Sequence, residues 1–445
     1  MSNWGSNQAP SETNGSGWHI LQDEDYSELA IQVHRRLLQE LDVAAVSRLD
    51  RESARAAVEA AARGILTTTA PELLGEQREQ VIRRVVDEAV DLGPLEPLLR
   101  DNTISEVMVN APDEVYYERD GVITESKIHF QDNDHILRIV DRILAPLGRR
   151  VDESAPYVDA RLPDGSRVNV IIPPLIPRSP TVTIRKFRPD KYTMDDLIAN
   201  QTVTPPLAKF LEACVRVRLN IIISGGSGTG KTTLLNALSG AIPIAERIVT
   251  IEDPIELRLQ QRHVIAAEAR PANIEGKNEV TQRELFRNAL RMRPDRIVVG
   301  EVRGPEAFDM LQAMNTGHEG SMTTVHANSP RDALWRIENM VLMSGIDLPV
   351  RAIREQMASA LHLVAHVARF ADGRRRITRV SELAGMEGDT VTMQDLFHFE
   401  QIGIDEDGHV LGEMKSTGVV PTFLELFEHA GVDMDTAYPF SQKWA

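Results

Sequence analysis

The sequence has little cysteine and no long apolar run, and each absence excludes a class of protein. Among 445 residues only Cys214 is a cysteine, so the chain cannot close an internal disulfide. Cys214 lies in an apolar stretch and is expected to be buried rather than reactive. No apolar run reaches the ~18 residues of a membrane-spanning helix, and the first residues lack the basic and apolar segments of a secretory signal. These features predict a cytoplasmic protein.

The chain also lacks an excess of basic residues. It carries 49 Lys and Arg against 66 Asp and Glu, a formal net charge of −17. A surface this acidic repels phosphate backbones unless its basic residues gather on one face, so no nucleic-acid partner is expected. Apolar residues make up 42% and charged residues 26% of the chain, as in ordinary globular proteins.

The pattern along the chain predicts a tail followed by a helical module. Residues 1–22 are rich in Ser, Asn and Gly with little to bury, and we expect them to be disordered. Residues 23–100 are expected to form a small all-α bundle. Within 79–90, apolar pairs recur every four residues and make one stripe on a helix. Asp50 is a candidate N-cap for the alanine-rich segment after it.

Two further domains are expected. In residues 101–192 the apolar period shifts toward two, interrupted by a helical stretch, which predicts an α+β domain with a mostly antiparallel sheet. Residues 193–205 are interpreted as a linker. In 206–445, strands alternate with helices, and Asp372-Gly373 marks a hairpin turn. Three of the four expected strands are short apolar runs, as in a buried parallel sheet of an α/β domain: 220–223, 247–251, 296–300 and 322–325.

The clearest motif is a glycine-rich loop between an expected strand and an expected helix. It fits G-x-x-x-x-G-K-[ST] at every fixed position. Glycines let the backbone curl so that its N–H groups face phosphates, and Lys231 would reach the β- and γ-phosphates while the Thr232 hydroxyl would bind Mg²⁺. A plain strand–helix turn is the alternative. The motif predicts ATP or GTP binding by Gly225, Gly226, Ser227, Gly228, Thr229, Gly230, Lys231, Thr232 and Thr233.

Two acidic strand ends are candidates for the catalytic base. Glu301 ends the strand that begins at Arg296, but Gly300 stands where the Walker B strand usually carries Asp. Glu301 is therefore either the base or a water-mediated Mg²⁺ ligand. Glu252, at the end of another strand, is the other candidate base. Either residue alone could instead be a solvated strand cap.

His318 and His326 flank the expected strand 322–325. A single histidine is usually structural, but two beside one strand after Glu301 suggest that one senses the γ-phosphate or its departure, with His326 the better candidate. Metal binding by the pair is not expected, because no further His or Cys has suitable spacing.

In this order, the loop, the Glu252-Asp253 box, the Gly300-Glu301 strand and the two histidines resemble the type II/type IV secretion ATPase superfamily. Longer sequence words resemble its CpaF/TadA branch, the ATPases of tight-adherence (Flp) pili; they lie at 159–169, 183–187, 288–296, 300–304 and 309–318. The likeness covers about residues 30–400. One departure is informative: with a single cysteine, the chain lacks the four-cysteine zinc module that related branches often carry.

The resemblance implies a RecA-like P-loop ATPase domain preceded by a PAS-like α+β domain and an all-α N-terminal bundle. It implies a homohexamer that uses ATP and Mg²⁺ to drive assembly or retraction of a pilus. Its partners would be inner-membrane pilus platform proteins, and through them alone the cytoplasmic motor would sit at the inner membrane. Arginines of the α+β domain would close over the nucleotide, and Arg161, Arg167 and Arg185 lie on the matching segments. Each could equally form a salt bridge within its sheet.

Three other functions fit parts of the sequence. A type IV secretion ATPase of the same superfamily would move effectors or DNA. A scaffold would bind ATP but hydrolyse little, as the missing Walker B aspartate suggests, although Glu252, Glu301 and the histidines argue against it. A helicase-like motor would show turnover stimulated by nucleic acid.

Overall fold

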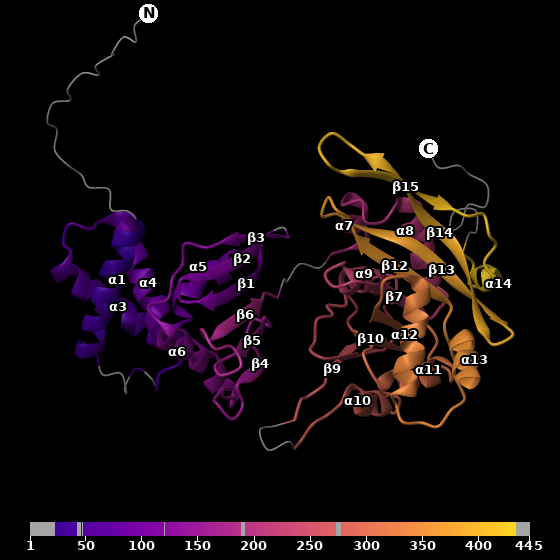
Figure 1. Cartoon of the computed structure of the whole chain (residues 1–445), viewed down its shortest axis with the longest axis horizontal. Coiled ribbons are helices and arrows are strands. Elements are labelled where there is room, and N and C mark those ends of the chain that lie inside the picture. The colour runs from indigo at the N-terminus through magenta and orange to yellow at the C-terminus, as the bar shows by residue number, and fades with distance from the viewer. Residues whose placement is uncertain are drawn as a thin grey trace, which may run out of the picture. The chain divides into compact units, whose positions relative to one another are not determined.

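The computed structural model describes residues 23–41, 46, 48–119, 121–187, 192–272 and 277–432. The chain divides into two compact units, residues 1–188 and 189–445, called here the N-terminal unit and the C-terminal unit (Figure 1). The tail 1–22, predicted to be disordered, lies outside the described residues. Within the described ranges, no helix is both long and apolar enough to cross a bilayer.

Three helices begin the N-terminal unit: α1 (Asp23–Glu40), α3 (Arg51–Thr69) and α4 (Gly75–Val90). They bury one shared core, to which α4 contributes the predicted stripe of Val81, Ile82, Val85 and Val86. The Asp50 carboxylate accepts hydrogen bonds from the backbone N–H groups of Glu52 (3.1 Å) and Ser53 (3.0 Å). Asp50 therefore caps α3, as its position before the alanine-rich segment predicts.

An antiparallel six-stranded sheet completes the N-terminal unit, in the order β3-β2-β1-β6-β5-β4. The apolar face of α6 (Asn133–Leu144) packs on one face of this sheet. Short helices η1 (Gly93–Leu95) and α5 (Glu96–Arg100) precede the sheet, and η2 (Ala145–Leu147) follows α6. The strands are β1 (Ile104–Ala111), β2 (Glu114–Arg119), β3 (Val122–Glu125), β4 (Tyr157–Arg161), β5 (Arg167–Ile171) and β6 (Thr181–Arg185).

The C-terminal unit is built on a nine-stranded sheet, in the order β15-β14-β13-β12-β7-β11-β10-β8-β9. The strands from β12 to β9 are parallel, whereas β13, β14 and β15 extend the sheet antiparallel. The strands are β7 (Ile221–Gly225), β8 (Ile248–Glu252), β9 (Val264–Glu268), β10 (Arg296–Val299), β11 (Met322–His326), β12 (Leu363–Arg369), β13 (Arg375–Glu387), β14 (Thr390–Ile404) and β15 (Val410–Ser416).

Helices cover both faces of this sheet, as the continuous apolar strands predict (Figure 1). One apolar core joins the sheet to α7 (Met194–Ala199), α8 (Pro205–Arg216), α9 (Lys231–Ser239) and α14 (Leu424–His429). The other joins it to α10 (Gln282–Ala289), α11 (Glu306–Met314), α12 (Pro330–Leu342) and α13 (Val350–Ala360). The unit is an α/β RecA-like domain, with β7 inside the parallel sheet, so the predicted fold class is confirmed.

The segment 193–205, interpreted from the sequence as a linker, folds within the C-terminal unit. Thr193 caps α7: its hydroxyl accepts from the Asp196 N–H, and the Asp196 carboxylate accepts from the Thr193 N–H. Met194 and Leu197 are buried in the core that α7 shares with α9. This capping box and its buried residues explain why the segment is ordered, and the two compact units divide earlier, at residue 188.

Candidate nucleotide-binding site

The glycine-rich loop joins the end of β7 to the start of α9. Gly228 and Gly230 have backbone φ angles of +68° and +95°, which residues with a side chain rarely adopt. At Gly225 a Cβ would lie 2.4 Å from the backbone oxygen of Val367, so the adjacent strand β12 leaves no room for one. The loop thus has the curl that its sequence predicts.

The first turn of α9 carries Lys231, Thr232 and Thr233. The N–H groups at a helix start have no partner within the helix, and the helix dipole favours an anion there. The Lys231 ammonium donates to the Gly226 carbonyl at 2.7 Å, which keeps this cation folded over the loop. The arrangement fits a phosphate chain: backbone N–H groups, a lysine and a threonine hydroxyl meet at one helix end.

The carboxyl ends of four parallel strands meet beside this loop. In register, His326 at the end of β11 lies next to Gly225 of β7. Val299 of β10 pairs with Ile251 of β8, so Glu301 and Glu252 both follow at the same edge. Since ligands of open α/β sheets bind at the carboxyl ends of the strands, the structure brings these three predicted residues to the expected edge.

Glu252 is buried, with 1% of its surface exposed, and both of its carboxylate oxygens accept hydrogen bonds. Oε2 accepts from the backbone N–H groups of Glu256 (2.6 Å) and Leu257 (2.7 Å), and Oε1 accepts from the Thr250 hydroxyl (2.9 Å). Burial raises the pKa of Glu252, which these hydrogen bonds partly offset. Its geometry is that of a side chain closing the loop after β8.

The Glu252 side chain also explains the glycine in the Walker B position. A Cβ on Gly300 would lie 3.1 Å from Cγ of Glu252 and 3.5 Å from its Oε2. An aspartate at position 300 would therefore place a second carboxylate against a buried one. The strands have room for one acidic side chain here, and it comes from β8.

Glu301 is more accessible: 25% of its side chain is exposed, and Oε2 accepts a 2.6 Å hydrogen bond from Arg303. That bond raises the pKa of Arg303. Burial lowers the pKa of His326, and the nearby charge of Lys231 lowers it further, while Glu301 acts in the opposite direction. The lowered pKa favours the neutral imidazole of His326, at the edge of the sheet that also carries the glycine-rich loop.

His318 lies elsewhere. It precedes β11, whose first residue Met322 pairs with Ile221 at the start of β7. The opposite end of β11, where His326 lies, is about 16 Å away for five residues of strand. The His318 backbone oxygen accepts from the Ser321 hydroxyl at 2.8 Å. Within this unit, the structure does not bring His318 to the edge that carries the glycine-rich loop.

The three predicted arginines lie side by side in the sheet of the N-terminal unit. Arg161 of β4 is paired with Arg167 of β5, Arg167 with Arg185 of β6, and Arg185 with Glu106 of β1. Directly paired residues point to the same face, and Val168 shows that the opposite face is the one packed by α6. The sheet thus presents a row of three positive charges that ends beside the carboxylate of Glu106.

Sequence reasoning missed three residues at this edge. Glu256 lies 3.5 Å from the Thr232 hydroxyl, and the second Glu of the motif Glu252-Asp-Pro-Ile-Glu256 could have indicated it. His366 of β12 is hydrogen-bonded to the Ser224 hydroxyl at 2.8 Å, and burial lowers its pKa to about 4. Arg375 contacts the glycine-rich loop itself, with Nε donating to the Gly228 carbonyl at 2.9 Å.

Among the described residues, no group of three His, Cys, Asp or Glu side chains could hold a metal ion on its own. The oxygen donors at the helix start are the Thr232 hydroxyl and the Glu256 carboxylate 3.5 Å from it, while Glu301 lies at the same edge of the sheet after β10. Mg²⁺ prefers oxygen ligands and keeps several waters, so such a sparse set suits it when phosphate oxygens complete the shell.

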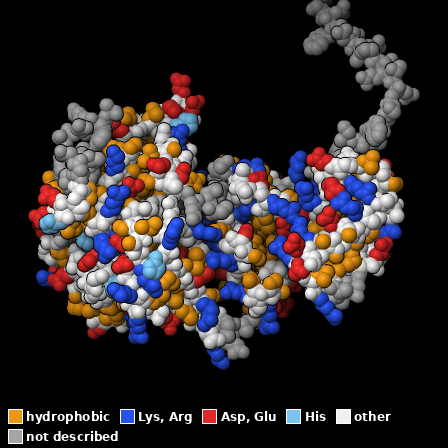
Figure 2. All heavy atoms as spheres, turned by 180° about the vertical axis from the view of Figure 1, so that it is seen from behind, with side chains coloured by type: hydrophobic (Ala, Val, Ile, Leu, Met, Phe, Trp, Pro, Cys, Tyr) orange, Lys and Arg blue, Asp and Glu red, His pale blue; other side chains and the backbone are white. Residues whose placement is uncertain are grey.

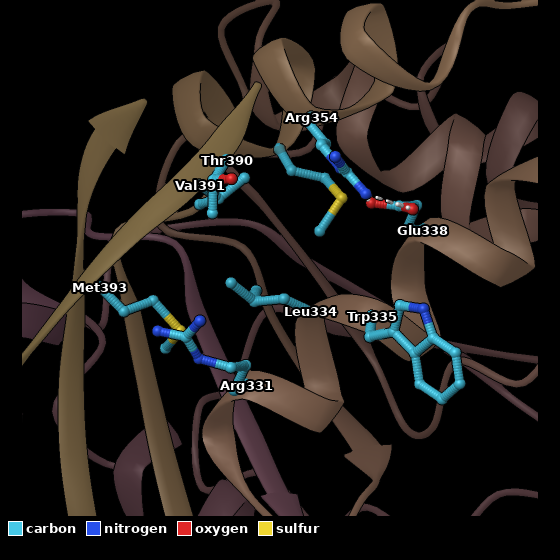
Figure 3. A pocket seen from close by; sticks show the side chains of 9 residues that line it. Arg331, Leu334, Trp335, Glu338, Arg354, Thr390, Val391 and Met393 are labelled. Atoms are coloured by element: carbon cyan, nitrogen blue, oxygen red, sulfur yellow. Dashed lines mark hydrogen bonds and ion pairs between the residues drawn. The ribbon is translucent and has the colours of Figure 1, made fainter. Parts of the chain in front are cut away.

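Two hollows lie along α12. One, of about 540 Å³, is lined by His326, Ala327, Asn328, Asp332, Trp335, Arg336 and Asn339. The second, of about 150 Å³, lies between α12, α13 and β14, and Figure 3 shows the Glu338–Arg354 ion pair at its side. Its lining contains none of the residues of the glycine-rich loop. Only the larger hollow reaches the predicted site, through His326.

Comparisons with known proteins show what this chain is similar to. The family model described as "Type II/IV secretion system protein" matches residues 88–404. A Mycobacterium tuberculosis protein, provisionally named for conjugal transfer, is 38% identical over 349 residues, covering 77% of this chain and 98% of its own. The type IV secretion system protein VirB11 of Brucella suis is 32% identical over 316 residues, 65% of this chain and 88% of its own. The crystal structure of the Brucella suis VirB11 ATPase with sulphate matches at 31% identity and TM-score 0.36, covering 64% of this chain and 94% of that one.

Proposed function

Because this chain belongs to the type II/IV secretion system protein family, we propose that it is an ATPase motor that assembles or retracts a Tad/Flp-type (type IV) pilus through an inner-membrane platform. One observation carries the ATPase assignment: the glycine-rich loop places Lys231 at the start of α9, with Glu301 and His326 at the same edge of the sheet. The pilus assignment rests on the sequence words that resemble the CpaF/TadA branch.

The loop and the first turn of α9 bind the phosphates of ATP in this proposal. The backbone N–H groups at the helix start face the β-phosphate, and Lys231 turns from the Gly226 carbonyl to the β- and γ-phosphate oxygens. The Thr232 hydroxyl holds Mg²⁺, which when bound neutralises charge on the phosphates. A phosphate oxygen is a stronger acceptor than a carbonyl, so this exchange favours binding.

Glu301 is the better candidate for the base that accepts a proton from the attacking water. Glu252 is buried, and both of its oxygens are engaged: Oε2 accepts from two N–H groups of the loop after β8, and Oε1 accepts from the Thr250 hydroxyl of β8. The Glu301 carboxylate accepts from Arg303 and is partly exposed at the edge. His326, whose pKa is lowered by burial and by the charge of Lys231, is the proposed sensor of the γ-phosphate. Because His318 lies at the far end of β11, it is not part of this proposed site within the C-terminal unit.

Arg161, Arg167 and Arg185 of the N-terminal sheet are proposed to act on the nucleotide, as the family resemblance implies. A guanidinium stays charged and bridges phosphate oxygens, which suits the charge that develops on a transferred phosphoryl group. In a homohexamer the row would act on ATP bound by the same or a neighbouring subunit. The motor would then be cytoplasmic, and peripheral to the inner membrane through its platform partners.

A second function, an ATPase of a type IV secretion system that moves effectors or DNA, is favoured by the names of the relatives. They include a provisional conjugal transfer protein and VirB11. On the face of the C-terminal unit seen in Figure 2, acidic and basic side chains are interspersed, without the basic stripe of a nucleic-acid surface. Deletion of the gene in its host separates the two: loss of pili supports the first, loss of transfer with intact pili the second.

Steady-state ATP hydrolysis by the purified protein, with its oligomeric mass measured in parallel, tests the ATPase proposal. We expect slow Mg²⁺-dependent turnover by a hexamer that added DNA does not stimulate. Lys231→Ala is expected to abolish turnover, and Glu301→Gln to bind ATP while losing roughly a hundredfold or more in rate, as for a lost general base. Glu252→Gln is the matched control and is expected to keep turnover.

Two results would contradict this assignment. Normal turnover by Glu301→Gln would remove Glu301 from the role of base. Tight ATP binding by a well-formed hexamer that does not hydrolyse, even with its platform partner added, would favour the scaffold function instead.

A further inference from the structure

The hairpin between β12 and β13 reaches the glycine-rich loop from a distant part of the sequence. β12 runs parallel to β7, with Val367 paired to Gly225, so the hairpin turn lies beyond the same edge of the sheet. Arg375, the first residue of β13, donates from Nε to the Gly228 carbonyl at 2.9 Å. Its Cδ lies 3.3 Å from where a Cβ on Gly230 would stand. The side chain therefore covers the loop from Gly228 to Gly230.

The neighbours of Arg375 hold it in this place. The Asp372 carboxylate accepts from the backbone N–H groups of Arg374 and Val410, both at 3.0 Å, which fixes the turn. Arg376 is buried and donates to the Val410 carbonyl at 3.0 Å. Its guanidinium lies over the rings of Phe370 and Phe399, 5.1 and 5.5 Å from their centres. Arg375 is thus carried by an anchored hairpin and not by a free loop.

We propose that Arg375 is a second cation of the nucleotide site and contacts the phosphate chain of bound ATP or ADP. This inference rests on the proposed ATP binding and adds a residue from the C-terminal hairpin to it. The Arg375 guanidinium already lies against the loop through the Gly228 carbonyl, and its planar fork of N–H donors matches phosphate oxygens. Lys231 is held in the same way, by the Gly226 carbonyl of the same loop. A phosphate oxygen is a stronger acceptor than either carbonyl, so both cations gain by turning to it.

The adjacent Arg374 provides a matched control. It carries the same charge and is also exposed, but its Nη1 donates to Oε1 of Gln201 at 3.0 Å and not to the loop. A general electrostatic attraction of ATP to the hairpin would weaken equally on removal of either arginine. A direct phosphate contact would depend on Arg375 alone.

Equilibrium binding of ATP and of ADP to the full chain, measured by calorimetry at fixed salt, tests the inference. Arg375→Ala is expected to weaken both by roughly tenfold or more, because a charge-assisted hydrogen bond is lost. Arg375→Lys is expected to lie between wild type and Arg375→Ala, and Arg374→Ala to match wild type. Thermal unfolding without nucleotide is the second measurement, and we expect the Arg375 and Arg374 variants to unfold at the same midpoint temperature.

The outcomes separate the two levels of the proposal. If wild type binds ATP and Arg375→Ala binds within about twofold of it, the inference is overturned while the proposed function stands. An equal loss in Arg374→Ala would overturn it as well. If the wild-type protein does not bind ATP, the proposed function fails, and the inference fails with it.

Discussion

Glu252 gives the sharpest test of how this site is built. Its carboxylate takes two backbone N–H groups, from Glu256 and Leu257, and the Thr250 hydroxyl, and it does so while buried. Replacing it with alanine removes all three acceptor contacts and brings no new partner. We expect Glu252→Ala to destabilise the C-terminal unit because buried donors are left unsatisfied.

The size of the effect follows from the accessibility of those donors. Leu257 is buried, so leaving its N–H without an acceptor costs the full desolvation penalty, about 1–3 kcal/mol. Glu256 is half-buried, and water can replace part of its lost bond. Together the expected loss is about 2–4 kcal/mol. In Glu252→Gln, the amide oxygen can accept from both backbone groups and the amide nitrogen can donate to Thr250, so we expect a loss of about 1 kcal/mol or less.

Thermal and urea unfolding of the two variants measure these values, and Asp253→Ala is the control. Asp253 is the next residue in the same motif but is exposed, so its replacement is expected to change the free energy of unfolding little. If Glu252→Ala were no less stable than Asp253→Ala, the loop-closing role would be refuted. If Glu252→Gln folded normally but stopped hydrolysis, Glu252 would be the base after all.

Two further predictions concern neighbouring strands. The pKa of His366, lowered by burial to about 4, lies below its unfolded value of 6.5, so the unfolded chain takes up the proton first as pH falls. In unfolding measurements, we expect His366 to account for about 2 kcal/mol of the stability lost from pH 7 to pH 5, and His366→Asn to remove that part of the loss; an unchanged slope in the variant would contradict this. Gly300→Asp is expected to cost about 2 kcal/mol or more, since it crowds Glu252. A double-mutant cycle with Glu252→Ala should recover part of that loss, and strictly additive effects would count against the clash.

Local signals in the sequence predicted local structure well. Asp50 caps α3 because a carboxylate just before a helix can accept hydrogen bonds from the unpaired N–H groups of the first turn. The strand–loop–helix context of Lys231 predicts the curl of the loop, because that curl needs positive φ angles, which glycine adopts most readily. Asp372-Gly373 forms the predicted hairpin turn for the same kind of reason.

The features that the sequence did not predict depend on strand order and register, which cannot be read from a single sequence. Arg375 contacts Gly228 across 147 residues, and only the placement of β12 beside β7 brings them together. The distance between His318 and His326 is likewise set by the direction of β11, because one precedes the strand and the other ends it. The row formed by Arg161, Arg167 and Arg185 is visible only once the antiparallel pairing is known.

The same register accounts for the unusual Walker B strand. β8 and β10 are neighbours, and the residues after Ile251 and Val299 compete for one space. Glu252 fills it and closes a loop whose next glutamate, Glu256, lies beside the Thr232 hydroxyl. Glycine at position 300 therefore leaves room for the Glu252 side chain, and the absence of an aspartate there has a structural reason. The carboxylate that contacts the threonine of the glycine-rich loop comes from the loop after β8, and the partial exposure of Glu301 fits the base that we propose it to be.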